Sequence, residues 1–507
     1  MTSLHPDAEI RCHGVSSKIM LIDNAVSKRL SGLLLCLLAA SVPEAHLNAQ
    51  SLSPGNTAKS TPDAFLEKRP FLQIPGPNPI VVRGGKGAWD EDVIEACDVL
   101  KDFETYYFYY HGVPKDQTKW GVLGYRIGLA TASRPLGPWV KYGAQPVLDL
   151  GPKGSWEDKH VASAFVLREK PGKFVMWYSG AGQSTPWGIG IATASKPEGP
   201  WQKYERNPII PNFGYVGGVV KLNGTYYLYT EHPIGSTAPD YGPISLATAS
   251  SPEGPWTIWD HNPVLAPGTS GAWDDGGYSE SKVTYWDGLF HMFYGGAKEY
   301  QPRILTRESI GYANSTDGFQ FTKYGGNPVA ARESEPNMAS YSEVHTLFEP
   351  PFIYAFHTIR YIDPKMASVP GGIGIEDLGV QILAPDSAFS IAIPAVGGSS
   401  LSHGTSTQWR HSPPISLSHA AHVSLMAECK YGAGATGAMR VHVRSSADGL
   451  NYDTSDLLVF SNNLVPAGVG RKTVFLQPGV RFIKVIVENT DKSAALTDYG
   501  VVATLNR

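Results

Sequence analysis

Cysteine is scarce in this chain of 507 residues, which has only four. Cys97 and Cys429 fall in regions that the repeat pattern assigns to different domains, so we expect two buried thiols rather than a disulfide framework. A basic stripe is absent as well, and the formal net charge is -4. The chain therefore offers no electrostatic surface suited to nucleic acid.

The chain also lacks an apolar run long enough to cross a bilayer as a permanent helix. The short apolar run at residues 33–40 follows the basic pair at 28–29 and precedes small residues at 45–49. This order is typical of a secretory signal peptide. We therefore expect a leader with a signal peptide at 1–49, a linker at 50–70, a secreted or periplasmic location and no membrane association after processing.

Helical periodicity is nearly absent. The chain contains 54 glycines, 39 prolines and 11% aromatic residues, and its apolar residues follow a period of two rather than 3.6. This combination predicts an all-β protein with many turns.

A ten-residue motif occurs three times almost unchanged. The copies are ATASRPLGPW at 130–139, ATASKPEGPW at 192–201 and ATASSPEGPW at 247–256, with a degenerate fourth, ANSTDGFQF, at 313–321. The copies recur about every 55 to 65 residues, and each interval holds several short apolar and aromatic runs. Such a repeat is the sequence pattern of a β-propeller.

Other elements accompany the motif in a fixed order. Each copy is followed by Asn-Pro or Gln-Pro, and an aromatic strand occurs five times in all, which predicts five blades. A tryptophan beside acidic residues precedes three of the blades, at Trp89, Trp156 and Trp273. The Asn-Pro segment from Pro75 to Val82 has no blade of its own. We expect it to complete blade five and close the ring, because closure removes exposed sheet edges.

The repeat ends near Leu383. Residues 386–507 show alternating strands separated by Gly, Ser and Asn turns, which is the pattern of a β-sandwich. We therefore expect a five-bladed β-propeller at 71–385 followed by a C-terminal β-sandwich domain. Ser315–Gly318 and Ser446–Gly449 look like hairpin turns, and both also resemble the Asp boxes of sialidases.

Acidic residues at the starts of innermost strands are the main catalytic candidates, because a propeller has one shared site at the mouth of its channel. Glu280 and Glu343 lie inside apolar strands, where an unpaired carboxylate is costly. Glu95 takes the corresponding position in blade one, and Asp92 is close behind it. Blades four, five and one are neighbours in a closed ring, so we predict that these residues face one ligand.

Acidic residues that directly follow the tryptophans have a different interpretation. Asp90, Glu157 and Asp274 repeat around the ring, and repetition favours an architectural role in turns over a catalytic one. The three tryptophans could stack on sugar rings, but their repeated position favours blade packing.

Further polar residues at the same mouth are predicted to bind substrate: Asp158, His160, Glu231, His232, His345 and Arg360. The three histidines could also hold a metal, but no HxH or HxxE spacing groups them. We therefore expect neither a metal nor a cofactor.

The five blades, the Asn-Pro and Gly-Pro-Trp elements and the acidic strand starts resemble the five-bladed propeller glycoside hydrolases, the superfamily that contains families 43, 32, 117 and 130. The resemblance covers about residues 71–385. It implies an Asp base on the first blade, an Asp that tunes a pKa on the second and a Glu acid on the third.

The resemblance transfers to this chain only in part. Asp92 or Glu95 matches the base, and Asp158 is a possible second residue. Blade three offers Tyr215 in place of the acid, so Glu280 is the substitute that we predict.

Glycoside hydrolysis is the function that these residues favour, because it needs one protonated carboxyl and one ionised carboxylate at the same mouth. Crowding of like charges separates their pKa values. We expect cleavage of plant or algal poly- or oligosaccharides. The alternative is a non-catalytic carbohydrate-binding propeller. A phosphorolytic reaction would need a cationic phosphate site, for which Lys282, Arg303 and Arg360 are too few.

Overall fold

The computed structural model describes residues 71–231, 242–298, 308–332, 338–362, 373–477 and 479–507. The predicted leader and linker lie outside the described residues. Regular structure is almost entirely β, as predicted, with short helical turns at α2 (Gln117–Trp120) and η4 (Trp409–His411). In the part of the chain that the structure describes, no helix has the length and apolarity needed to span a membrane.

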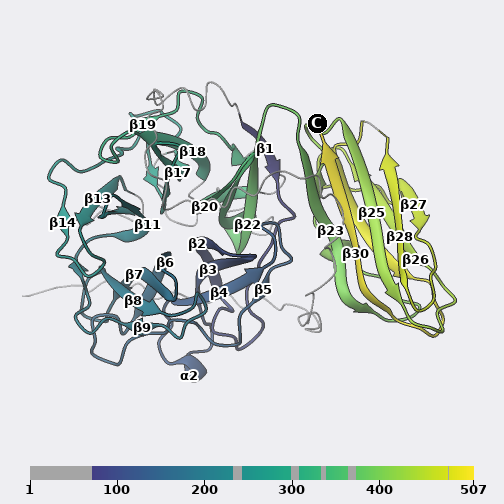
Figure 1. Ribbon diagram of the computed structural model, residues 1–507, viewed down its shortest axis with the longest axis horizontal. Helices are drawn as coiled ribbons and strands as arrows, with labels where there is room; N and C mark the ends of the chain where they lie inside the picture. The colour runs from purple at the N-terminus through teal and green to yellow at the C-terminus, as the bar shows by residue number, and fades with distance from the viewer. Residues whose placement is uncertain (1–70, 232–241, 299–307, 333–337, 363–372, 478) are drawn as a thin grey trace, which may run out of the picture.

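The described residues between 71 and 385 form five antiparallel sheets, numbered I to V here, which lie around a common centre (Figure 1). Sheet I contains β2 (Val93–Asp102), β3 (Thr105–Val113), β4 (Arg126–Ala132) and β5 (Val140–Lys141). Sheet II contains β6 (His160–Lys170), β7 (Lys173–Ala181), β8 (Gly188–Ala194), β9 (Gln202–Lys203) and β10 (Ile210–Pro211). Sheet III contains β11 (Tyr215–Leu222), β12 (Thr225–Glu231), β13 (Ile244–Ala249) and β14 (Thr257–Ile258).

Sheet IV contains β15 (Gly277–Tyr278), β16 (Lys282–Trp286), β17 (Leu289–Ala297), β18 (Glu308–Ser315) and β19 (Thr322–Lys323). Sheet V contains β20 (Met338–Glu349), β21 (Phe352–Ile362), β22 (Ile373–Pro385) and β1 (Phe71–Pro75). The first strands of neighbouring sheets contact one another around the centre, from β2 through β6, β11 and β16 to β20 and back to β2. This ring of first strands is where a shared site can form.

Strand β1 is the outer strand of sheet V, although it comes first in the described chain. It pairs antiparallel with β22, with Phe71 opposite Pro385 and Pro75 opposite Gln381. The expectation that the amino-terminal Asn-Pro segment completes the fifth unit is therefore confirmed. The side chain of Ile74 is buried in the apolar core and anchors the strand there.

The repeated tryptophans pack within their own sheets. The ring of Trp89 stacks on Tyr110 at a centroid distance of 5.6 Å. A Cβ added at Gly128 would lie 2.6 Å from this indole, so glycine is required beneath it. Trp156 and Trp273 lie in the same way over Gly190 and Gly311. Blade packing, rather than sugar stacking, accounts for these residues.

The acidic residues after the tryptophans are buried and paired. Each forms an ion pair with a lysine near the outer strand of its sheet: Asp90 with Lys141 at 2.5 Å, Glu157 with Lys203 at 3.0 Å and Asp274 with Lys323 at 2.8 Å. A pair repeated in three sheets ties the entry loop of each sheet to its edge, as an architectural role requires.

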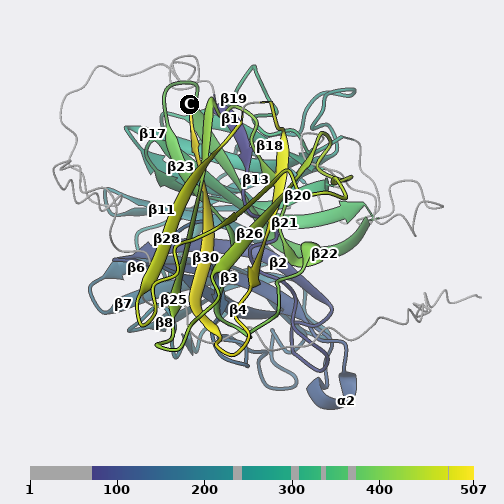
Figure 2. The same cartoon turned by 90° about the vertical axis from the view of Figure 1, so that its right-hand side faces the viewer.

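The remaining strands form two four-stranded sheets beside the ring (Figures 1 and 2). One sheet contains β23 (Ser390–Leu401), β30 (Leu496–Asn506), β25 (His422–Tyr431) and β28 (Val469–Leu476). The other contains β24 (Ile415–Ser416), β29 (Phe482–Asn489), β26 (Met439–Ser446) and β27 (Leu458–Ser461). Cys97 and Cys429 are both free buried thiols, as expected.

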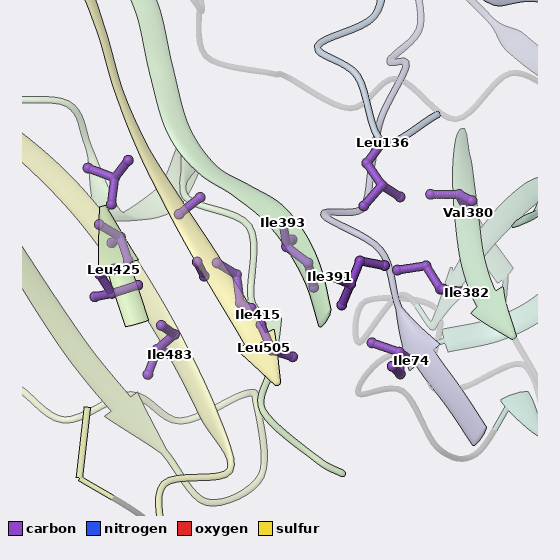
Figure 3. Close-up of a cluster of buried hydrophobic side chains, with 14 of the residues drawn as sticks. Ile74, Leu136, Val380, Ile382, Ile391, Ile393, Ile415, Leu425, Ile483 and Leu505 are labelled. Carbon is purple, nitrogen blue, oxygen red and sulfur yellow. The ribbon is translucent and has the colours of Figure 1, made fainter. Parts of the chain in front are cut away.

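The two regions share one apolar cluster. Figure 3 shows Ile391 and Ile393 of β23 close to Ile74 of β1 and Ile382 of β22, and all four residues belong to the same buried core. Burial of apolar surface in this shared cluster stabilises both regions together. The C-terminal sheets are therefore packed on sheet V rather than tethered loosely.

The two Ser-x-Asp-Gly turns have the same geometry. In each turn the serine hydroxyl donates to the aspartate and accepts from the glycine N–H: Ser315 with Asp317 and Gly318, and Ser446 with Asp448 and Gly449. These bonds satisfy the turn locally, which explains both motifs as turn chemistry.

Candidate active site

The first strands are irregular at one level of the ring. The register shifts between Ala96 and Asp98 in sheet I, and between Ser342 and His345 in sheet V. Sheet II has a similar shift between Ala162 and Phe165. Ser163 in sheet II and Glu343 in sheet V take positive φ angles of 51° and 48° at these shifts, a backbone region that is costly for residues other than glycine. The bulges redirect side chains at the centre of the ring, as bulges do next to many active sites.

Side chains at this level tie neighbouring sheets together. Thr358 Oγ1 of sheet V accepts a hydrogen bond of 2.8 Å from the Ala96 N–H of sheet I. His111 Nδ1 of sheet I accepts one of 3.0 Å from the Ser163 N–H of sheet II, and Ser179 Oγ of sheet II accepts one of 2.9 Å from Val216 of sheet III. These hydrogen bonds between sheets set the relative positions of the first strands and therefore of the acids that they carry.

Arg360, near the end of β21, is the charge centre of the site. Its side chain is 1% exposed. Its guanidinium contacts four glutamates: Glu376 at 3.1 Å, Glu343 at 3.3 Å, Glu95 at 3.4 Å and Glu308 at 3.5 Å. They come from sheets V, I and IV, so one cation joins three sheets.

Glu308 is the most buried of these four carboxylates. Its oxygens accept hydrogen bonds from Ser279 Oγ at 2.6 Å and Ser342 Oγ at 2.8 Å. Burial raises the pKa of Glu308 to about 7, against the lowering effect of Arg360. Glu308 therefore lies at the border between its neutral and charged forms near neutral pH.

Glu280 lies beside this group on sheet IV. One carboxylate oxygen accepts a hydrogen bond from the Ser163 hydroxyl of sheet II. Burial, and secondly the negative charge of Glu343, raise the pKa of Glu280 well above its ordinary value. The raised pKa favours the protonated form of Glu280, whereas Glu343 forms an ion pair with Arg360.

Like the architectural Glu157, three glutamates at the centre of the ring keep a buried oxygen for which the described residues supply no hydrogen-bond partner. These are the Oε2 atoms of Glu280, Glu343 and Glu376. A buried acceptor without a partner costs about 1–3 kcal/mol, so native sites that retain such atoms call for a specific explanation. Hydroxyl groups of a polyol ligand would satisfy all three.

Glu95, His111 and Cys97 form a chain that resembles a nucleophilic triad. His111 Nε2 lies 2.7 Å from Glu95 Oε2, and Cys97 Sγ lies 3.4 Å from His111 Nδ1. Nδ1 already accepts from the Ser163 N–H, so the ring proton belongs on Nε2 and is donated to Glu95. Burial lowers the pKa of His111 to about 4 and raises that of the Cys97 thiol well above its ordinary value. The thiol is therefore inert, and His111 acts by orienting Glu95.

Two of the predicted acids lie apart from the buried glutamates. Asp92 forms an ion pair of 3.1 Å with Lys115, and its side chain is 44% exposed. Asp158 accepts hydrogen bonds of 2.7 Å from the Gly154 and Gln183 N–H groups, which lower its pKa. Asp158 thus caps a turn, and Asp92 is more exposed than the glutamates with which it was predicted to share a ligand.

The register also corrects the alignment of Glu95. Glu95 pairs with His111 as Ser342 pairs with Thr358. Ala96, rather than Glu95, is therefore the counterpart of Glu343. Glu95 nevertheless reaches the shared site, because its side chain extends to Arg360.

The other predicted substrate-binding residues are spread over the ring. His160 begins β6, is partly exposed and accepts a 3.3 Å hydrogen bond at Nδ1 from the Tyr125 N–H. Glu231 is buried at the end of β12, opposite Tyr215. His345 is 1% exposed in β20, and burial lowers its pKa well below the ordinary value. His232 lies outside the described residues.

Metal ligation was the alternative for the histidines. Within the described ranges, no group of three or more His, Cys, Asp or Glu side chains is arranged to hold a metal ion. Burial lowers the pKa of His160 to about 4, so this ring is neutral at physiological pH.

Sequence reasoning missed Glu308 and Glu376, although the repeat contains a signal for both. His111 pairs with Ile127, and the equivalent second-strand residues Ser179, Glu231, Gly295 and Thr358 pair with Ile189, Ile244, Ile310 and Leu378. The residues two positions before these partners are Tyr125, Trp187, Gly242, Glu308 and Glu376. One position in the repeat therefore carries an aromatic residue, a glycine or a glutamate, depending on the sheet.

Comparisons with known proteins give structural similarities only. No family model matches the chain, and no curated protein matches it. Among solved structures it is similar to a thermostable family-43 glycoside hydrolase, with 18% identity, a TM-score of 0.43 and coverage of 61% of this chain and 95% of that chain. It is also similar to a glycosyl hydrolase from Bacteroides ovatus, with 14% identity, a TM-score of 0.46 and coverage of 62% and 94%. A family 32 β-fructofuranosidase from Bombyx mori has 12% identity, a TM-score of 0.43 and coverage of 84% and 93%.

These solved structures belong to the kinds of enzyme that the sequence resembles. Their identities with this chain are low. The function proposed below therefore rests on the residues of this chain.

Proposed function

We propose that sheets I to V are the blades of a five-bladed propeller at residues 71–385, that residues 386–507 form an accessory β-sandwich, and that the protein is a secreted glycoside hydrolase. The proposed substrates are poly- or oligosaccharides of plants or algae. The site lies at the centre of the ring, around Arg360.

One observation carries this proposal. Three carboxylates at the centre of the ring, two of them paired with Arg360, each keep a buried oxygen that no described residue hydrogen-bonds. A folded protein tolerates this desolvation cost where a ligand supplies the missing donors. Sugars supply several hydroxyl donors at close spacing, so a carbohydrate fits the arrangement.

The acid and base roles follow from the different surroundings of two glutamates. Glu280 is neutral and holds its proton in a buried site, so it is the proposed general acid that protonates the glycosidic oxygen as the bond to the anomeric carbon breaks. Glu343 forms an ion pair with Arg360 and is the proposed base or nucleophile. In the first case Glu343 takes a proton from the attacking water, and in the second it bonds to the anomeric carbon.

The surrounding groups maintain this division. Arg360 offsets the negative charges of Glu343, Glu95 and Glu376, while Ser163 orients the Glu280 carboxyl. One carboxyl with a raised pKa near one carboxylate that is ion-paired is the general pattern of acid–base sites.

The direct test is turnover by matched variants. A panel of aryl glycosides and of plant and marine oligosaccharides is screened with the wild-type protein. The best substrate is then given to Glu280→Gln and to Asp274→Asn. Loss of a general acid costs about 10²- to 10⁴-fold in rate, and we expect this for Glu280→Gln with an unchanged melting curve. Asp274→Asn removes the ion pair with Lys323, so it should lower the melting temperature but retain turnover.

Two results would contradict the proposal. One is full activity in Glu280→Gln. The other is loss of activity in a folded Asp274→Asn protein, which would reverse the assignment of catalytic and architectural acids.

A non-catalytic carbohydrate-binding propeller is the second candidate. The contacts between Arg360 and four glutamates favour it, because paired carboxylates can serve as fixed acceptors for sugar hydroxyls without reacting. Saturable binding of an oligosaccharide that the wild-type protein does not cleave would support this candidate over hydrolysis.

A further inference from the structure

The end of the ring that carries the acids also carries a group of ring side chains. Tyr125 and Trp187 directly precede the third strands β4 and β8, while His160 and Tyr215 begin the first strands β6 and β11. In an antiparallel sheet, the starts of the first and third strands lie at the same edge as the end of the second strand. Arg360 lies near the end of second strand β21, so both groups occupy the same end of the ring.

The four rings contact one another in sequence. The His160 ring stacks on Trp187 at a centroid distance of 5.2 Å and an interplanar angle of 24°. Trp187 contacts Tyr215 at 4.7 Å, and Tyr125 contacts His160 at 5.5 Å. Tyr125 also contacts His111 at 4.5 Å, and His111 holds Glu95. The ring group therefore continues directly into the acidic site.

Departure from the repeat separates these rings from the packing aromatics. Tyr125 and Trp187 occupy the repeat position at which sheet III has Gly242 and sheets IV and V have Glu308 and Glu376. Trp89, Trp156 and Trp273, by contrast, stand at a position that repeats as tryptophan, and each lies over a glycine. Tyr125, His160, Trp187 and Tyr215 all remain partly exposed. The site thus has its aromatic residues on sheets I to III, and its glutamates on sheets IV and V together with Glu95 of sheet I.

We propose that Tyr125, His160, Trp187 and Tyr215 form a binding shelf for a sugar ring of the substrate whose neighbouring bond reaches the glutamates. This inference rests on the proposed function, because it places a second part of the same ligand. Aromatic faces bury the apolar C–H face of a sugar, and a few polar groups at the rim fix its orientation.

His160 supplies such a polar group. Its Nδ1 accepts from the Tyr125 N–H, and a neutral imidazole with an accepting Nδ1 carries its proton on Nε2. The shelf therefore offers one N–H donor of fixed tautomer to an oxygen of the sugar. Trp187 supplies the apolar face, and His160 selects among sugars by the position of a hydroxyl group.

Binding and turnover are measured separately to test the shelf. Fluorescently labelled protein is applied to an array of plant and algal glycans, and the oligosaccharide with the strongest signal is titrated by calorimetry. Four proteins are compared: wild type, Trp187→Ala, His160→Phe and Tyr142→Ala. Tyr142 is an exposed aromatic residue directly after β5, so its variant controls for nonspecific aromatic contact.

We expect Trp187→Ala to weaken binding about 10- to 100-fold, as truncation of a central aromatic contact does, while Tyr142→Ala binds like wild type. His160→Phe keeps a ring but removes the donor, so it should bind several array sugars with reduced discrimination. Melting curves verify that each variant is folded.

The outcomes distinguish the shelf from the reaction. Equal affinity of wild type and Trp187→Ala would overturn the shelf while leaving hydrolysis by Glu280 intact. Selective loss of binding in Trp187→Ala, in a protein that cleaves none of the bound glycans, would support the shelf and contradict the proposed hydrolysis. Absence of saturable binding by the wild-type protein would overturn the shelf.

Discussion

Lys282 Nζ lies 2.6 Å from Asp98 Oδ1, and this ion pair joins sheet IV to sheet I inside the ring. The lysine also donates to the Val99 carbonyl at 2.9 Å. Asp98 Oδ2 accepts a hydrogen bond of 3.1 Å from the Val166 N–H of sheet II. The pair therefore holds three sheets together. A phosphate-binding site would need an accessible cation, but Lys282 is engaged in this pair.

Replacing Lys282 alone should be strongly destabilising. Lys282→Met leaves the Asp98 carboxylate buried without its cation, and loss of one partner from a buried pair costs about 3–5 kcal/mol. Urea unfolding measures the change. The double variant Lys282→Met, Asp98→Asn should recover most of the loss, because no uncompensated charge remains. Equal stability of the single variant and wild type would show that the pair contributes nothing.

Glycine is required beneath the packing tryptophans. At Gly311 an added Cβ would lie 2.4 Å from Tyr294 and 2.8 Å from Trp273, so Gly311→Ala should cost about 1–3 kcal/mol through overpacking. Gly325→Ala, in the turn after β19, is the control, since no atom lies within 4 Å of its Cβ position. Thermal unfolding of both variants checks this expectation. Similar losses at the two positions would contradict the packing explanation.

The repeat made much of the architecture predictable. Residues that recur in three units, such as Trp89 and Asp90, could be assigned to packing and to turns before any coordinates, because the same role repeats in three sheets. The pairing of β1 with β22 followed from an Asn-Pro element without a unit of its own.

The site was predictable only in part. Glu280 and Glu343 were found because charged residues interrupt apolar strands. Glu308 was missed because its strand was read as a degenerate copy of the motif, and Glu376 because the fifth unit lacks the motif altogether. The sequence also does not reveal that Asp92 pairs with Lys115 while Glu95, three residues later, pairs with Arg360.

Glu308 should make stability depend on pH. Burial raises its pKa in the folded state from an ordinary 4.5 to about 7, so the folded protein holds this proton more tightly than the unfolded chain does. Its contribution is fully present below about pH 4.5 and is lost as the pH rises through about 7. Glu308→Gln cannot ionise and keeps an oxygen that accepts from Ser279 and Ser342.

The stability difference, Glu308→Gln minus wild type, should therefore increase between pH 4.5 and pH 8, by on the order of 2 kcal/mol. Chemical denaturation at several pH values measures this difference. Other titrating groups, including Glu280, are present in both proteins and largely cancel. A difference that stays constant with pH would contradict a raised pKa at Glu308.

Closure of the ring by β1 gives the last prediction. Residues 71–82 contribute the β1 pairing with β22, and further hydrogen bonds run from Gly76 to the Val380 carbonyl and from Ile80 to the Leu378 carbonyl. A chain that starts at residue 83 exposes the edge of β22 and removes the buried Ile74, whose truncation alone would cost about 2–5 kcal/mol. We expect a lower melting temperature and concentration-dependent association through the open edge.

Adding a synthetic peptide of residues 71–82 should reverse both effects, because the strand pairs through its backbone and its side chain at 74 re-enters the core. A scrambled peptide should reverse neither effect. A shortened chain with wild-type stability, or equal rescue by the scrambled peptide, would show that the ring does not depend on this strand.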